Sequence, residues 1–96
     1  MNKLTSTIKQ DWLKEIVSGR KTVEYREIKP YWTKRLTQVS CPFLLRLING
    51  MSAHAPEVTV IIDRVRKNTR SGNYELHIGG VVEVRNWDRS RESPRV

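Results

Sequence analysis

Two β-rich runs in the second half of the chain constrain the fold most. Residues 58–65 are largely β-branched, and residues 74–78 alternate apolar with polar side chains. The polar loop between them contains Ser71-Gly72, a pair that is typical of turns. The sequence therefore predicts a long hairpin. Residues 81–84 extend it beyond Gly79-Gly80, a pair that permits a bulge or a sharp bend.

The first segments of the chain alternate between the strand period and the helix period. Residues 4–8 follow period two, which predicts a first strand. Gln10–Ser18 carries apolar residues at helical spacing, beginning with Trp12, and Gly19 follows where a left-handed helix cap is needed. Residues 22–26 return to period two and predict a second strand.

The middle of the chain predicts a second helix and a buried strand. Pro30–Thr37 begins with the residue that best suits the first turn of a helix, and Phe43–Ile48 is an apolar run too short for a typical helix. With the hairpin, the order is β-α-β-α-β-β-β, so we expect an α+β fold on a curled, mostly antiparallel sheet. We expect one domain over residues 1–88. Residues 89–96 are rich in Arg, Ser and Glu and predict a disordered tail.

The charge of the chain indicates the kind of partner it attracts. Its 96 residues include 18 Lys or Arg and 10 Asp or Glu, which gives a net charge of +8. Residues 1–70 hold fourteen basic and six acidic side chains, whereas residues 71–96 hold four of each. A basic surface of this kind attracts polyanions, although an excess of Lys and Arg also serves simply to keep a small domain soluble.

The Cys and His residues argue against several classes of protein. Cys41 has no partner for an internal disulfide, which indicates a reducing, cytoplasmic location. The first residues lack the apolar run of a signal peptide, and no stretch reaches the roughly 20 apolar residues of a membrane span. His54 and His77 lack Cys or carboxylate partners at metal-ligand spacing. We therefore expect no membrane, metal or cofactor.

Charged residues after the first helix form the main candidate site. Alternation places Val23 and Tyr25 on the core face of the predicted strand. Glu24 and Arg26 share its polar face, where Lys21 can join them in one pocket. Arg offers a planar fork for phosphate, Lys a point charge, and Glu an acceptor for an exocyclic amine. The alternative is a solvated ion pair between Glu24 and Arg26, which would stabilise the fold little.

Aromatic residues among cations add to this candidate site. Tyr31 and Trp32 lie close in sequence to Lys29 and Arg35, and single-stranded nucleic acids stack their bases on such rings. On the predicted helix, Trp32 packs against the core and Tyr31 is freer. Arg46 interrupts a buried strand, and a buried arginine needs an ion pair or a ligand. We therefore expect Arg46 to close the pocket.

The predicted hairpin and its loop carry four more cations: Arg64, Arg66, Lys67 and Arg70. They could extend a track for phosphates, or they could simply be solvated. The sequence favours the solvated interpretation.

The segment that begins at residue 16 resembles the ASCH domain family, a branch of the PUA-like β-barrels. The family pattern is a helix ending in glycine, then a Lys-Thr pair, then a strand with an acidic or polar residue and an arginine. Five residues match it: Gly19, Lys21, Thr22, Glu24 and Arg26. Residues 46–50, 77–80 and 86–88 are similar to the small prokaryotic or phage branch with Glu-Tyr-Arg in the motif. The resemblance implies a PUA-like barrel with a cleft, between the early helices and the sheet, for RNA or a modified nucleotide.

The resemblance also implies alternatives. Some small bacterial ASCH proteins look like amidohydrolases acting on N4-acetylcytidine, and others are linked to RNA cleavage. Lys21 matches the lysine of the amidohydrolases, but Glu24 stands where they have a threonine nucleophile, so an enzyme here would use Lys21 and Glu24 for acid–base catalysis. A third alternative is a protein-binding adaptor of mobile-element origin. The preferred hypothesis is RNA or nucleotide binding by these residues: Lys21, Thr22, Glu24, Arg26, Lys29, Tyr31, Arg35 and Arg46.

Overall fold

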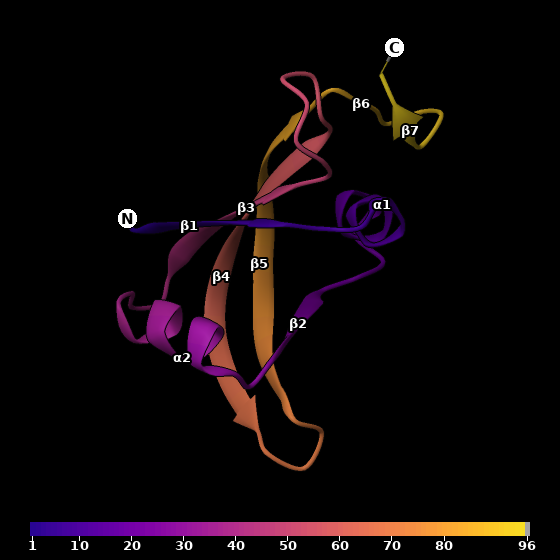
Figure 1. Ribbon diagram of the computed structural model, residues 1–96. Coiled ribbons are helices and arrows are strands. Elements are labelled where there is room, and N and C mark those ends of the chain that lie inside the picture. Colours follow the sequence, from indigo (N-terminus) through magenta and orange to yellow (C-terminus); the bar gives the residue numbers. More distant parts are fainter. Residues whose placement is uncertain (96) are drawn as a thin grey trace.

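The computed structural model describes residues 1–95. Its elements, in chain order, are β1 (Lys3–Thr7), α1 (Gln10–Ser18), β2 (Val23–Glu27), α2 (Pro30–Thr37), β3 (Phe43–Ile48), β4 (Glu57–Asn68), β5 (Asn73–Arg85), β6 (Trp87–Asp88) and β7 (Ser93–Pro94). The predicted α+β class and the two early helices are confirmed (Figure 1). No helix in the described residues is both long and apolar enough to cross a lipid bilayer.

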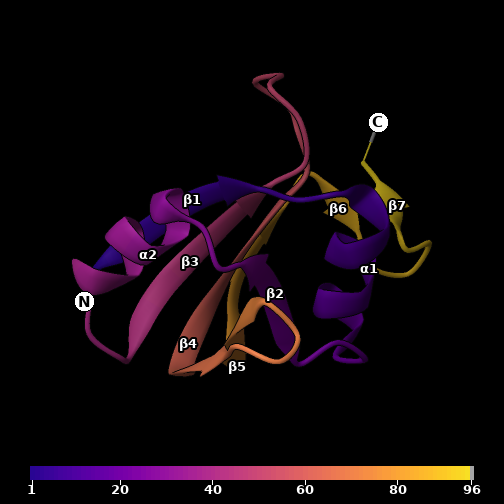
Figure 2. The same ribbon diagram turned by 60° about the horizontal axis from the view of Figure 1, so that its bottom comes forward.

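The five longer strands form one curled, mixed sheet that resembles half of a barrel. Their order is β1-β3-β4-β5-β2, so β1 and β2 are its two edges. Three of the four pairings are antiparallel, and β1 pairs with β3 in parallel. Edge strand β2 connects α1 to α2 and lies between the two helices in both views (Figures 1 and 2). The curl leaves an opening between the two edge strands, beside the helices.

The central hairpin of β4 and β5 has the predicted form. It runs from the pair Glu57–Arg85 to the pair Asn68–Asn73, and its register shifts on either side of Ile62. The shift lies opposite Gly79-Gly80, where the sequence predicts a bulge or bend. The Asp63 carboxylate occupies the space that a Cβ on residue 79 would fill, so a larger residue than Gly79 would require Asp63 to shift.

The core lies between the concave side of the sheet and the two helices. Strand β3 alternates strictly, with Phe43, Leu45 and Leu47 fully buried. Helix α1 contributes Leu13 and Ile16, which are also fully buried. Among the described residues β2 contributes none, and the remaining core residues come from β1 and the residue after it, from α2, β4 and β5, and from β6: Leu4, Ile8, Trp32, Val58, Val60, Ile62, Tyr74, Leu76 and Trp87.

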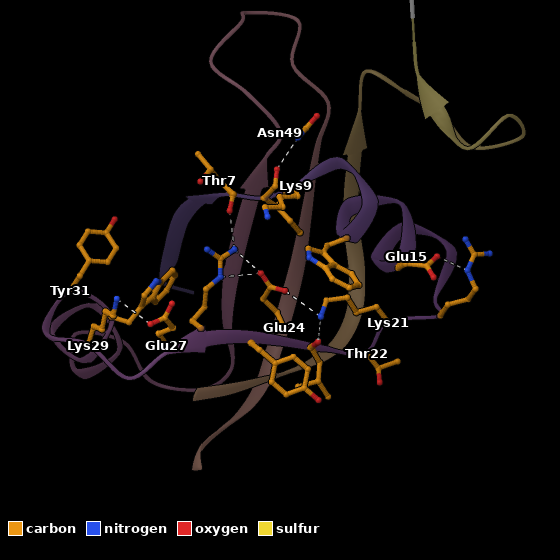
Figure 3. Close-up of a pocket in the computed structure, with 17 residues that line it drawn as sticks. Thr7, Lys9, Glu15, Lys21, Thr22, Glu24, Glu27, Lys29, Tyr31 and Asn49 are labelled. Atoms are coloured by element: carbon orange, nitrogen blue, oxygen red, sulfur yellow. Dashed lines mark hydrogen bonds and ion pairs between the residues drawn. The ribbon is translucent and has the colours of Figure 1, made fainter. Parts of the chain in front are cut away.

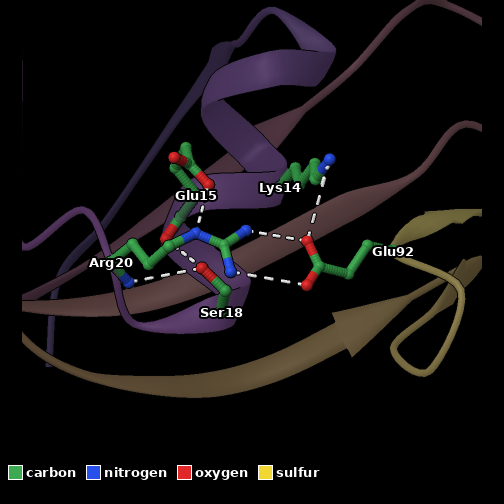
Figure 4. A network of polar contacts seen from close by, with 5 residues as sticks. All are labelled: Lys14, Glu15, Ser18, Arg20 and Glu92. Carbon is green, nitrogen blue, oxygen red and sulfur yellow. Dashed lines mark hydrogen bonds and ion pairs between the residues drawn. The ribbon is translucent and has the colours of Figure 1, made fainter.

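The segment after β5 contains two short strands, β6 and β7, and β7 lies within residues 89–96, whose disorder stays a prediction from composition. The segment folds back so that β6 pairs with β7. Arg20 donates a hydrogen bond of 2.7 Å from Nη2 to Oε2 of Glu92, and Lys14 lies 3.8 Å from the same oxygen (Figure 4). Glu92 of this segment thus contacts Lys14 of α1 and Arg20 just after it. Composition alone does not reveal such contacts. Val96, the last residue of the expected tail, lies outside the described residues.

Candidate functional site

A cleft of about 1130 Å³ opens between the edge strands and the first turns of both helices (Figure 3). Its walls come from the end of β1, α1, the turn after α1, β2 and the start of α2. Six of the eight predicted site residues line it: Lys21, Thr22, Glu24, Arg26, Lys29 and Tyr31. Arg35 and Arg46 lie outside its lining.

Glu24 lies at the centre of the cleft wall and is only 5% exposed. Arg26 donates to its Oε2 from Nη2 at 2.6 Å and from Nε at 3.0 Å. Lys21 Nζ lies 3.4 Å from Oε1, the other carboxylate oxygen. The predicted convergence of these three charges on one pocket is therefore present in the structure. Oε1 keeps spare acceptor capacity, since its only protein contact among the described residues is this long one.

The face of β2 that carries these charges is the inner face, which corrects the expected orientation. Tyr25, assigned to the core by alternation, is 53% exposed, whereas Glu24 is buried. The charged face can turn inward because Arg26 and Lys21 compensate the buried carboxylate, as burial of a charge requires. Tyr25 in turn packs its ring under the Lys21 ammonium, with Nζ 4.9 Å from the ring centroid.

Arg26 joins the two edge strands of the half-barrel. Besides its bonds to Glu24, it donates to Ser6 Oγ at 3.2 Å and to the Thr7 carbonyl oxygen at 2.8 Å, both on β1. Its guanidinium also lies 5.1 Å from the Trp32 ring centroid. A guanidinium has five N–H donors, and these contacts use four of them. Arg26 therefore mainly positions Glu24 and ties β1 to β2, with one N–H left for a ligand.

Lys21 is held between two exposed rings. It donates a hydrogen bond of 2.6 Å to the Val23 carbonyl oxygen, and its Nζ lies 5.2 Å from the Trp12 ring centroid as well as close to Tyr25. Trp12 is 52% exposed, although the sequence places it on the apolar face of α1. It lies at the margin of that face, one position before the buried Leu13. A large aromatic residue at the margin of an apolar helix face is the sequence signal that could have identified Trp12 as a residue of the cleft.

The rim of the cleft is mostly cationic. Five cations line the cleft against three carboxylates. Lys9, on the chain between β1 and α1, is exposed, and Lys29 pairs only loosely with Glu27, since both side chains are largely exposed. Tyr31 is exposed and meets the buried Trp32 edge to face, with ring centroids 5.8 Å apart. The expectation that Trp32 packs while Tyr31 stays free is confirmed.

The two predicted residues outside the cleft have structural partners. Arg35 donates to the Thr5 carbonyl oxygen at 2.7 Å and stacks beside Tyr31, with 5.1 Å between its guanidinium and the ring centroid. Arg46 faces away from the core and donates two bonds of 2.9 Å to Glu57. These bonds lower the pKa of Glu57. Alternation on β3 explains why Arg46 does not close the pocket: Leu45 and Leu47 take the inner face.

The described residues offer no group of three or more His, Cys, Asp or Glu side chains that could hold a metal ion. No model of a known protein family matches the chain. Curated proteins give no match either. The function must therefore be inferred from the chemistry of the cleft.

Proposed function

We propose that the chain binds RNA or a nucleotide in this cleft. The observation that carries the proposal is the combination, in one opening, of exposed aromatic rings with an excess of cations. The rings are those of Trp12, Tyr25 and Tyr31. Bases of every kind stack on such rings, and cations beside them neutralise the phosphates. Neither feature alone would distinguish a nucleic-acid site from an ordinary charged surface.

Glu24 and Lys21 supply the contacts to a base edge. Glu24 Oε1 accepts a hydrogen bond and Lys21 Nζ, 3.4 Å away, donates one. Lys21 has three N–H donors, and its two protein contacts leave one for a ligand. An adjacent acceptor and donor match the ring N–H and the neighbouring carbonyl oxygen of uracil, as they match the exocyclic amine and the neighbouring ring nitrogen of cytosine. The exposed Lys9 in the cleft lining supplies a positive charge for a phosphate of the ligand.

The motif resemblance supports the same proposal and extends it to the fold. Gly19, Lys21, Thr22, Glu24 and Arg26 match the ASCH pattern, and in this structure they form the turn and strand that build the cleft. We therefore assign the chain to the PUA-like barrels as part of this proposal. The curled half-barrel, with a binding cleft beside its early helices, agrees with that assignment.

The test is a titration with uridine 5′-monophosphate and with a ten-nucleotide uridine RNA, measured by isothermal titration calorimetry. Trp12→Leu should weaken binding by about 1–3 kcal/mol, the contribution of one stacked base, and Lys21→Gln should weaken it as well. Arg89→Gln is the matched control, because Arg89 is exposed and lies outside the cleft lining. Binding that is equal in the Trp12→Leu, Lys21→Gln and control proteins would contradict the proposal.

A further inference from the structure

The outer face of the sheet continues from the cleft across two more strands. The register pairs Tyr25 of β2 with Glu75 of β5, and Glu75 with Arg66 of β4. Neighbouring strands lie about 4.8 Å apart, so the backbone of Arg66 is roughly 10 Å from that of Tyr25. The next row pairs His77 with Arg64. Residues that are paired across strands share a face, so both arginines lie on the same face as the exposed Tyr25 ring.

Both arginines keep most of their hydrogen-bond donors free. The Arg66 side chain is 64% exposed, and its one ion-pair contact in the described part of the chain is Glu75, at 3.8 Å. Glu75 is mostly covered and accepts a bond of 3.0 Å from Asn68, so its charge is already engaged by the protein. Arg64 is exposed and lies 3.4 and 3.5 Å from the two ring nitrogens of His77. Two exposed guanidinium groups beside each other form a phosphate-binding pair.

The next cation along β4 faces the other side of the sheet. Lys67 pairs with Tyr74, whose side chain is buried and shares a hydrogen bond of 2.6 Å with Thr33 of α2. Lys67 is exposed, but it therefore lies on the inner face of β4, away from Tyr25. Lys67 carries the same charge as Arg66 at the neighbouring position but on the opposite face of the sheet. It is therefore a matched control for whether the outer face binds the RNA.

We propose that the ligand is a single-stranded RNA several nucleotides long, and that Arg64 and Arg66 hold the phosphates that follow the nucleotide in the cleft. This inference rests on the proposed function and chooses RNA over a free nucleotide. The strand leaves the cleft at Tyr25 and Lys21, crosses the edge strand β2, and runs over the outer face of β5 to β4. A mononucleotide reaches the cleft alone and does not contact either arginine.

The test compares wild type, Arg64→Gln/Arg66→Gln and Lys67→Gln by the affinity for the ten-nucleotide uridine RNA at several salt concentrations. Each lost phosphate contact reduces the magnitude of the slope of log affinity against log salt by about 0.7, so the slope of the double variant should be shallower than that of wild type by about 1.4. Between 50 and 200 mM salt, wild type should then lose roughly sevenfold more affinity than the double variant. Lys67→Gln should keep the wild-type slope, and the affinity for uridine 5′-monophosphate should be the same in all three proteins.

The outcomes separate this inference from the function on which it rests. Two results would contradict the proposed path of the RNA over the outer face. One is a wild-type salt slope in the double variant. The other is a loss of slope in Lys67→Gln that is half as large as that in the double variant. If the RNA binds no more tightly than the mononucleotide while Lys21→Gln weakens the binding of both, the proposed binding in the cleft is supported. The proposed path of the RNA over Arg64 and Arg66 is then wrong. If wild type binds neither ligand, the proposed function fails, and this inference fails with it.

Discussion

Replacing Arg26 by methionine should destabilise the protein strongly. The Arg26 side chain is 17% exposed, and its loss would leave the buried Glu24 carboxylate with Lys21, at 3.4 Å, as its remaining ion pair among the described residues. Removing one partner of a buried ion pair destabilises a protein by about 3–5 kcal/mol, because the other charge stays buried without compensation. Arg26→Met also removes the bonds to Ser6 and Thr7 that tie the two edge strands together.

This loss is large relative to the whole stability of a small domain. A chain of this length has a free energy of unfolding of about 5–14 kcal/mol, so the variant should lose about a fifth of it or more. Each kcal/mol shifts Tm by about 4–8 °C at this size, which predicts a fall of at least about 12 °C. Urea unfolding followed by far-UV circular dichroism measures the free energy, and a thermal scan measures the shift.

A double-mutant cycle isolates the ion pair. Glu24→Leu alone leaves Arg26 partly buried without its carboxylate, so it should destabilise the fold as well. The double variant Glu24→Leu/Arg26→Met removes both charges, and we expect it to be more stable than either single variant. Arg85→Met is the control, because both side chains of the Arg85–Glu83 pair are exposed, and its loss should matter much less. Equal effects of Arg26→Met and Arg85→Met, with no coupling in the cycle, would refute the reasoning.

Two further predictions concern the C-terminal hairpin and the bulge. The hydrogen bond from Arg20 lowers the pKa of Glu92, so the contact stabilises the fold above the unfolded pKa of about 4.3 and is lost as pH falls through the lower folded value. Acid, or Glu92→Gln at neutral pH, should therefore reduce amide protection in residues 87–95 with little change in Tm; unchanged protection would contradict this. Gly79→Ala should destabilise the protein by about 1 kcal/mol because Asp63 must move, whereas Gly80→Ala, which meets open space, should be nearly neutral. Urea unfolding of both variants checks this, and equal effects would show that Asp63 yields freely.

Local sequence patterns predicted most of the elements but not all of their pairing. The helix over Gln10–Ser18 and the hairpin of β4 and β5 follow from periodicity, capping glycine and turn residues, which act over a few positions. The parallel pairing of β1 with β3 joins segments some forty residues apart, and no local pattern specifies which edge a strand joins. The contact between Glu92 and Arg20 likewise joins residues that lie far apart in sequence, so no local pattern specifies it.

The candidate site was predicted by residue type more reliably than by orientation. Lys21, Glu24 and Arg26 were identified because three ionisable groups in one short stretch can meet. Alternation divides a strand into two faces, but it does not say which face is buried, and hydrophobicity assigned Tyr25 inward. Trp12 follows the helical spacing of the apolar residues of α1, and that spacing does not show that its ring lies at the exposed margin of the apolar face.

The inward orientation of the charged face is itself an argument for function. A half-barrel of this size would be filled more stably by apolar side chains, since a buried ion pair is often no better for stability than its apolar replacement. Departures from the expected pattern tend to occur where function requires them. The double variant Glu24→Leu/Arg26→Met separates the two roles. If the buried charges serve the ligand, it should fold more stably than either single variant but bind uridine 5′-monophosphate about tenfold more weakly or worse, through loss of a charge-assisted hydrogen bond. If it binds as wild type does, Glu24 only shapes the fold, and the base edge is recognised elsewhere in the cleft.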